Sequence, residues 1–221
     1  VQMNRINFWG IFFLLIRKDV LLSPPEPKTR AGFLKYSHEI TLDPNTANTH
    51  LLLSEGNRKV TVMKQQQSYP DHPDRFTEYS QVLSRESLTG RCYWEVEWRG
   101  GEVGVAVAYK NISRAGSSYE CGFGNNDKSW ELHCETSSFQ FWHNGFLTVL
   151  SGPQSSRVGV YLDHRAGTVS FYSVSSDKLI HLHTFNTTFT EPVYAGFRVK
   201  PDSSIHLSFP CTFTSSSGGG G

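Results

Sequence analysis

Leu162-Asp163-His164-Arg165-Ala166-Gly167-Thr168-Val169-Ser170-Phe171-Tyr172 is the stretch that decides the fold of this chain. Leu162 ends one run of alternating apolar residues, and Val169 and Phe171 resume the alternation on one face. Gly167 can adopt the positive φ angle that a tight turn often needs. The stretch therefore predicts two antiparallel strands joined by a tight turn.

The upstream segment Gly90–Trp98 shows the same alternation. One face of this strand would carry Trp94, Val96 and Trp98, and the other would carry Tyr93, Glu95 and Glu97. Indole side chains bury large apolar areas, so we expect Trp94, Trp98 and Trp130 to face the core. We expect the face with Glu95 and Glu97 to be polar and solvated.

The composition suits an all-β protein. The chain has 221 residues, with 19 Gly, 10 Pro, 5 Trp, 9 Tyr and 15 Phe, and its short apolar runs are separated by turn residues. A single helix, within residues 30–37, is the only one expected. Many short strands at close spacing predict a sandwich of two antiparallel sheets.

Charge and cysteine spacing exclude several classes of partner. The net charge is +1 and the sequence contains no concentrated basic run, which argues against nucleic acid as a partner. Residues 6–16 are apolar but too few to span a bilayer, which takes about 20 residues, so no membrane partner is expected. The four cysteines are widely spaced, which predicts buried free thiols in a reducing, cytoplasmic compartment, with no disulfide framework, metal or cofactor.

The ends of the chain differ from its body. We place residues 1–27 outside the domain as an extension with a Pro-rich linker, residues 28–210 inside it, and residues 211–221 in a disordered Ser/Gly tail. Residues 1–22 could be a signal segment, a docked element or a stretch outside the true protein. The isolated domain is expected to be a monomer.

Three motifs in order give the chain a resemblance to a known family. Leu42-Asp43-Pro44, then Trp94-Glu95-Val96-Glu97, then Leu162-Asp163 with the turn and strand after it, resemble the PRY–SPRY domain. The PRY part would cover about residues 37–90 and the SPRY part about 91–210. The sequence most resembles fish members of this family. Those domains are found at the C-termini of tripartite-motif proteins, NOD-like receptors and stonustoxin-like proteins.

The resemblance implies a bent, concanavalin-like sandwich that recognises proteins through loops at one rim. Such domains often serve innate immunity and select substrates for ubiquitin ligases. His164-Arg165 departs from the usual aromatic and acidic pair, which makes this turn more cationic. The sequence shows no RING, B-box or coiled coil, so no ligase activity is assigned to it.

Six loop and strand residues are the candidates for partner binding. Loops on a rigid sandwich carry recognition, and Tyr and Arg contribute strongly to binding. In related domains an aromatic residue at the position of Tyr119 lines the peptide-binding cleft, and the positions of His133 and Arg198 contribute to the partner face in some members. The candidates are Tyr69, Asp71, Arg75, Tyr119, His133 and Arg198.

Two other functions stay open at this point. A lectin-like carbohydrate binder would use the same sandwich. A glycosidase would use Glu95 and Glu97, which lie two residues apart on one strand face, about 6–7 Å, within the range that paired carboxylates need. The preferred interpretation is a non-catalytic module that binds a protein or peptide.

Overall fold

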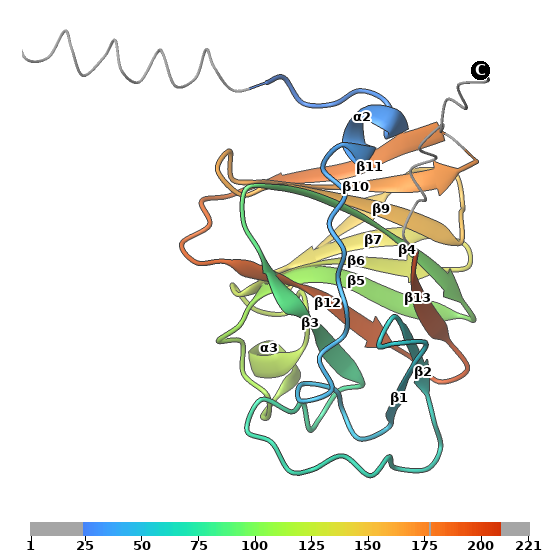
Figure 1. Cartoon of the computed structure of the whole chain (residues 1–221), viewed down its shortest axis with the longest axis vertical. Helices are drawn as coiled ribbons and strands as arrows, with labels where there is room; N and C mark the ends of the chain where they lie inside the picture. Colours follow the sequence, from blue (N-terminus) through green and yellow to red (C-terminus); the bar gives the residue numbers. More distant parts are fainter. Residues whose placement is uncertain (1–23, 177, 209–221) are drawn as a thin grey trace, which may run out of the picture.

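The computed structural model describes residues 24–176 and 178–208 and consists mainly of β-strands in two antiparallel sheets (Figure 1). The first sheet has the order β1-β2-β13-β4-β9-β10-β11. Its strands are β1 (Leu51–Ser54), β2 (Lys59–Val62), β13 (Ser204–Ser208), β4 (Arg91–Arg99), β9 (Arg157–Asp163), β10 (Thr168–Ser175) and β11 (Lys178–Asn186).

The second sheet packs against the first and has the order β3-β12-β5-β6-β7-β8. Its strands are β3 (Gln81–Leu88), β12 (Val193–Val199), β5 (Glu102–Tyr109), β6 (Ser129–Glu135), β7 (Phe139–His143) and β8 (Phe146–Leu150). The all-β sandwich expected from the sequence is therefore confirmed.

The core lies between the two sheets and is built from every second residue of their strands. Trp94, Trp98 and Trp130 expose 3%, 5% and 2% of their surface, so all three face the core as expected. They belong to one cluster that also holds Val105, Phe171 and other apolar residues of both sheets. Burial of this apolar surface is the main force that closes the sandwich.

The hairpin of β9 and β10 forms where the sequence predicts it. Asp163 organises the turn: one carboxylate oxygen accepts from the Ala166 N–H at 3.0 Å and the other from Arg91 Nε at 2.8 Å. Gly167 has a φ of +72°. A Cβ at this position would lie 1.8 Å from the Thr187 carbonyl oxygen, so both the backbone angle and the space require glycine.

In the described part of the chain, two short helices lie outside the sheets. The expected N-terminal helix is α2 (Arg30–Leu34), and Thr29 caps it by accepting from the Gly32 N–H at 3.2 Å. The second helix, α3 (Ser118–Cys121), lies within the long connection between β5 and β6, where the sequence predicted only a loop. Figure 1 shows α2 beside β10 and β11, at the opposite end of the molecule from β1 and β2.

The helix α2 overturns one expectation about the first sheet. Its Phe33 packs between Tyr93, Tyr161 and Tyr172, with ring centroids 4.9–5.5 Å apart. The outer side of β4 is therefore covered, and Glu95 is only 1% exposed. The prediction of a solvated face for Glu95 was wrong, because an element far away in sequence packs over it.

The apolar stretch 6–16 and the Ser/Gly tail lie outside the described residues. Residues 24–27, which were assigned to a linker, do contact the sandwich: the Pro24 carbonyl accepts from Arg91 Nη2 at 2.6 Å, and Glu26 accepts from the Tyr172 hydroxyl at 3.1 Å. No helix in the described part is long and apolar enough to cross a membrane. Cys92, Cys121 and Cys134 are buried and free.

Candidate partner-binding face

The outer surface of the second sheet is partly covered by the connection 110–128. Phe123 of this connection lies over the backbone of β12, because a Cβ on Gly196 would meet its ring at 2.8 Å. Phe76 packs on Phe123 at 5.5 Å, together with Ala106 and Ala108 of β5. Ala106 and Ala108, which alternate with valines along β5, thus make room for a covering segment.

Next to this covered area the sheet carries a cluster of polar side chains. Arg198 on β12 donates from Nη2 to Glu131 Oε2 at 2.7 Å and to His133 Nδ1 at 3.2 Å. Because Arg198 can only donate, His133 Nδ1 accepts, and its other nitrogen faces Glu102 at 3.1 Å. Lys200 approaches the same Glu102 oxygen at 3.5 Å. We call Glu102, Glu131, His133, Arg198 and Lys200 the polar cluster.

Glu131 is the most deeply buried member of the polar cluster. Its carboxyl has no exposed surface, and its Oε1 finds no hydrogen-bond partner among the described residues. Burial raises the pKa of Glu131 to about 7, against the attraction of Arg198 and Lys200. Burial also lowers the pKa of His133, and the positive charge of Arg198 acts in the same direction.

The sequence did not single out Glu131. Its side chain occupies the space above Gly104, where a Cβ would lie 1.8 Å from Glu131 Oε1. Gly104 was the available signal, since a glycine inside a strand often marks the close approach of another group. The identity of that group could not follow from local pattern, because Glu131 and its partner Arg198 are 67 residues apart.

Tyr119 lies on α3 and is 72% exposed. The helix is held by a capping box, in which Glu120 accepts from the Ser117 N–H at 2.7 Å, and by the buried Cys121. The Tyr119 ring lies near the β7–β8 turn, because a Cβ on Gly145 would be 3.8 Å from it. A large aromatic side chain is thus presented to solvent on a fixed support.

The other three candidates, Tyr69, Asp71 and Arg75, lie in the connection between β2 and β3. Tyr69 and Arg75 make contacts within the protein, whereas Asp71 is exposed. Arg75 is 7% exposed and donates to the carbonyls of Pro44, Ala47 and Pro70 at 2.8, 2.5 and 2.7 Å. Its guanidinium also lies 4.9 Å from the Tyr69 ring centroid. Arg75 therefore holds the loop in shape from inside.

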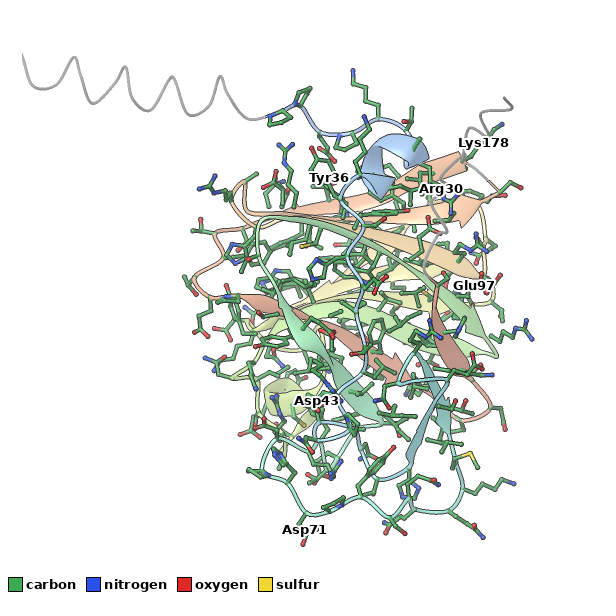
Figure 2. The ribbon with its side chains drawn as sticks, in the orientation of Figure 1. Arg30, Tyr36, Asp43, Asp71, Glu97 and Lys178 are labelled. Carbon is green, nitrogen blue, oxygen red and sulfur yellow. The ribbon has the colours of Figure 1, made fainter. Side chains whose placement is uncertain are left out.

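Tyr69 ties the same loop to the edge of β1. Its hydroxyl donates to the Leu51 carbonyl at 2.8 Å and accepts from the Leu53 N–H at 3.4 Å. Asp71 is exposed at the tip of this loop, at the lower end of the molecule in Figure 2. The structure thus joins Tyr69 to Arg75 and His133 to Arg198, but within the described part of the chain no hydrogen bond or ion pair joins these two pairs.

The two carboxylates considered for glycoside hydrolysis do not share an accessible cleft. Glu95 is enclosed by Arg30 Nε at 2.7 Å and the Tyr93 hydroxyl at 2.8 Å. Glu97 pairs with Arg157 Nη2 at 2.5 Å instead. A sugar could not reach Glu95 without removal of α2, so this pair lacks the accessible geometry that hydrolysis needs.

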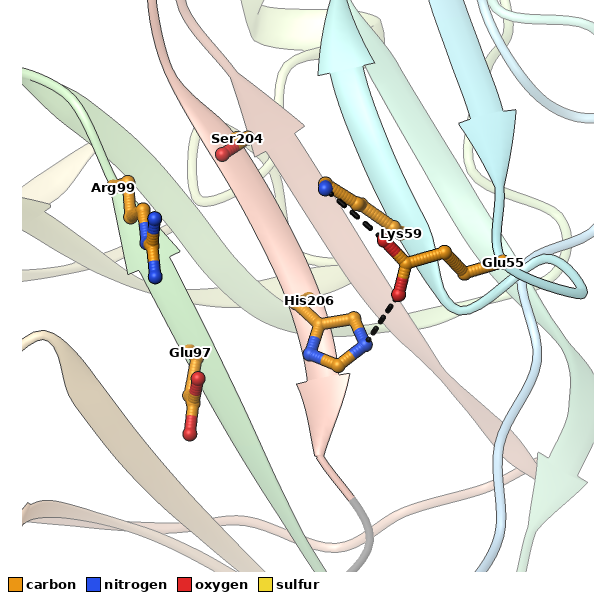
Figure 3. Close-up of a pocket in the computed structure, with 6 residues that line it drawn as sticks. All are labelled: Glu55, Lys59, Glu97, Arg99, Ser204 and His206. Carbon is orange, nitrogen blue, oxygen red and sulfur yellow. Dashed lines mark hydrogen bonds and ion pairs between the residues drawn. The ribbon is translucent and has the colours of Figure 1, made fainter.

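A polar pocket of about 210 Å³ opens on the outer side of the first sheet (Figure 3). It is lined by Glu55, Lys59, Glu97, Arg99, Ser204 and His206. Glu55 bonds Lys59 at 3.1 Å and His206 at 3.2 Å, and the bond from Lys59 lowers the pKa of Glu55. None of the six lining residues is Trp, Tyr or Phe, and the one ring in the pocket, that of His206, is paired with Glu55.

Histidine, cysteine and carboxylate side chains are not gathered for metal binding. In residues 24–176 and 178–208, no group of three or more such side chains could hold an ion. His183 and His143 pack instead against the aromatic rings of Phe141 and Phe185, at 4.4 and 4.7 Å.

The comparisons with known proteins identify the family. The model of the SPRY-associated domain, PRY, matches residues 40–88, and the model of the SPRY domain matches residues 91–212. The chain therefore belongs to the PRY–SPRY family, as its three ordered motifs indicate.

Two curated relatives show the range of this family. Tripartite motif-containing protein 16 of Mus musculus is 40% identical over 196 residues, which cover 87% of this chain and 35% of the relative. Stonustoxin subunit beta of Synanceia horrida is 43% identical over 175 residues, covering 78% of this chain and 25% of the relative. The chain thus spans about a third or less of these relatives.

Solved structures agree on the fold. A stonustoxin structure superposes with a TM-score of 0.78 at 37% identity, covering 84% of this chain and 32% of that one. The PSpry domain of TRIM65 superposes with a TM-score of 0.76 at 29% identity, covering 85% of this chain and all of the TRIM65 domain. The sandwich described above is that of the family.

Proposed function

We propose that this chain binds a protein or peptide partner and performs no chemistry of its own. The contact surface is the open part of the second sheet, with the polar cluster at its centre and Tyr119 at its margin. The observation that carries the proposal is the 72% exposure of Tyr119 on a capped, anchored helix. A rigid aromatic side chain held in the open contributes binding energy at little entropic cost.

The six candidates divide into contact residues and positioning residues under this proposal. Tyr119, Asp71 and the partly exposed Arg198 touch the partner. Arg75 and Tyr69 shape the first loop, while His133, only 7% exposed, orients Arg198. The cation of Arg198 and the aromatic ring of Tyr119 on one face favour a partner segment that presents both an acidic or carbonyl group and an apolar side chain.

The wider setting belongs to the same proposal. We place the domain at the recognition end of a longer tripartite-motif or NOD-like protein of innate immunity, where it would select substrates for a ubiquitin ligase in the cytoplasm. The relationship to tripartite motif-containing protein 16 and the buried free thiols support this setting. The free thiols fit a reducing compartment.

Partner capture with two matched variants tests the proposal. The immobilised chain captures proteins from cells that express it, and the same capture is repeated with Tyr119→Ala and with Ile180→Ala. Ile180 is 39% exposed on β11, away from the second sheet. We expect Tyr119→Ala to reduce the captured partner about tenfold or more, within the range of binding hot spots, and Ile180→Ala to leave it unchanged.

Equal capture by both variants would contradict the assignment of this face. Circular dichroism and thermal melting of each variant exclude a loss of fold, which is not expected at exposed side chains. Arg198→Ala is less suitable as a first test, because it would leave Glu131 buried without its cation and destabilise the sheet.

A further inference from the structure

The edge strand β8 differs from every other sheet edge of this protein. Three of its five residues are large, exposed apolar side chains: Phe146 at 76%, Leu147 at 46% and Val149 at 72%. In the described part of the chain, the backbone of residues 146–150 bonds to β7 and to no other segment. The strand therefore exposes both apolar surface and free backbone groups.

The other three edges are protected. Residues 41–48 cover β3, with backbone bonds from Arg85 to Thr41 at 2.8 Å and from Asp43 to Leu83 at 2.9 Å. The Tyr69 hydroxyl covers β1, as described above. The edge strand β11 carries the exposed Lys178, and a lysine at a sheet edge discourages strand pairing. Among the edge strands of the described residues, only β8 lacks a cover, a charge or a proline.

The turn before β8 determines which backbone groups are free. Asn144 and Gly145 have φ angles of +51° and +74°, which define a two-residue type I′ turn between His143 and Phe146. The flanking pair in such a hairpin exchanges both backbone bonds, and the alternation of antiparallel pairing then bonds Thr148 and Leu150 to β7. Leu147 and Val149 therefore direct their N–H and C=O groups outward.

We infer that β8 pairs with β8 of a second copy of this chain, antiparallel, with Thr148 opposite Thr148 on the two-fold axis. In this register Leu147 and Val149 of one copy bond Val149 and Leu147 of the other, which gives four backbone hydrogen bonds. The side-chain pairs are then Leu147 with Val149 and Phe146 with Leu150. Every apolar residue of the strand meets an apolar residue.

Charge also favours a second copy as the occupant. The segment from Asn144 to Ser156 contains no charged residue. Two copies therefore approach without like-charge repulsion, and a two-fold interface is self-complementary by symmetry. Two five-residue strands bury less than the roughly 1,200–2,000 Å² of stable complexes, so the dimer is expected to be weak, with a dissociation constant in the micromolar range or above.

A charge exchange on the two-fold axis tests this inference. Thr148 is exposed, so Thr148→Lys and Thr148→Glu are compatible with the fold. Like charges directly opposite each other destabilise a strand pair, and opposite charges stabilise it. By sedimentation velocity on the full chain, from micromolar to millimolar concentration, we expect wild type to associate reversibly and each variant alone to associate about tenfold more weakly.

An equimolar mixture of the Lys and Glu variants is expected to restore association. Ile180→Lys, which adds the same charge at an exposed apolar residue on the edge of the other sheet, is the matched control and should behave as wild type. A wild-type chain that stays monomeric throughout, or a mixture that shows no rescue, would overturn the inference. The Thr148 variants leave the partner face itself unchanged, because Thr148 pairs with the buried Phe141 and so lies on the other side of the sheet from the polar cluster. Partner capture is tested separately with Tyr119→Ala.

Discussion

Glu131 is the residue whose environment departs most from that of an ordinary carboxyl group. One of its oxygens is bonded to Arg198, while the other has no partner in the described part of the chain. Its pKa of about 7 in the folded chain lies above its ordinary value of 4.5. Between these two values the folded chain binds more protons than the unfolded chain, so this carboxyl's contribution to stability is lost as the pH rises through about 7.

The substitution Glu131→Gln should remove this dependence. Glutamine keeps the volume of the side chain and stays neutral at every pH. We expect the variant to gain stability relative to wild type as the pH rises: its free energy of unfolding minus that of wild type should increase from about pH 5 to about pH 8. Urea unfolding at several pH values measures this difference. The contribution of His133 to the pH dependence largely cancels in the difference, because His133 titrates in both proteins.

Glu191→Gln provides the control for the pH series. It makes the same change of side chain at an exposed carboxylate in the loop before β12. If the stability difference between Glu131→Gln and wild type depends on pH no more than that of Glu191→Gln, the Glu131 carboxyl is not stabilised in its protonated form.

At the scale of elements, the β9–β10 hairpin shows how one turn fixes a pair of strands. Gly167→Ala would force a side chain into the left-handed region, which costs about 1–2 kcal/mol, and would place its Cβ against the Thr187 carbonyl. We expect a loss of about 2 kcal/mol or more in the free energy of unfolding. Chemical denaturation of the variant measures it.

Gly56→Ala is the matched control for this turn. Gly56 has a φ of +68°, close to that of Gly167, but a Cβ there would meet no atom within 4 Å. It therefore carries the cost of the backbone angle without the steric contact. If both variants lose the same stability, the contact with Thr187 contributes nothing.

The sequence pattern predicted the helix α2, but it could not predict where this helix packs on the sandwich. Alternation correctly assigned Tyr93 and Glu95 to the face of β4 away from the core. It could not show that Arg30, 65 residues away, would cover Glu95 with bonds of 2.7 and 3.0 Å. Pairing between distant segments leaves no periodic signal, so a buried ion pair was interpreted as a solvated face.

At the scale of the whole molecule, the sandwich was predictable from the sequence, whereas most contacts of the polar cluster were not. The sandwich was predictable because its signals are local in sequence. Strand alternation is visible in the spacing of the tryptophans, and the turn is visible in the residues from Asp163 to Gly167. The polar cluster depends on neighbouring strands that are far apart in sequence. Arg75 was predicted to touch the partner, yet its guanidinium points to three backbone carbonyls of its own loops.

One face of this domain, the open part of the second sheet, is proposed to receive the protein partner, and hydrogen–deuterium exchange of the full chain, alone and with the captured partner, tests this assignment. We expect protection on binding to be concentrated in residues 69–75 and 110–128 and in β6, β7 and β12, with β1, β2 and β13 unchanged. Protection confined to β1, β2 and β13, around the polar pocket, would contradict it.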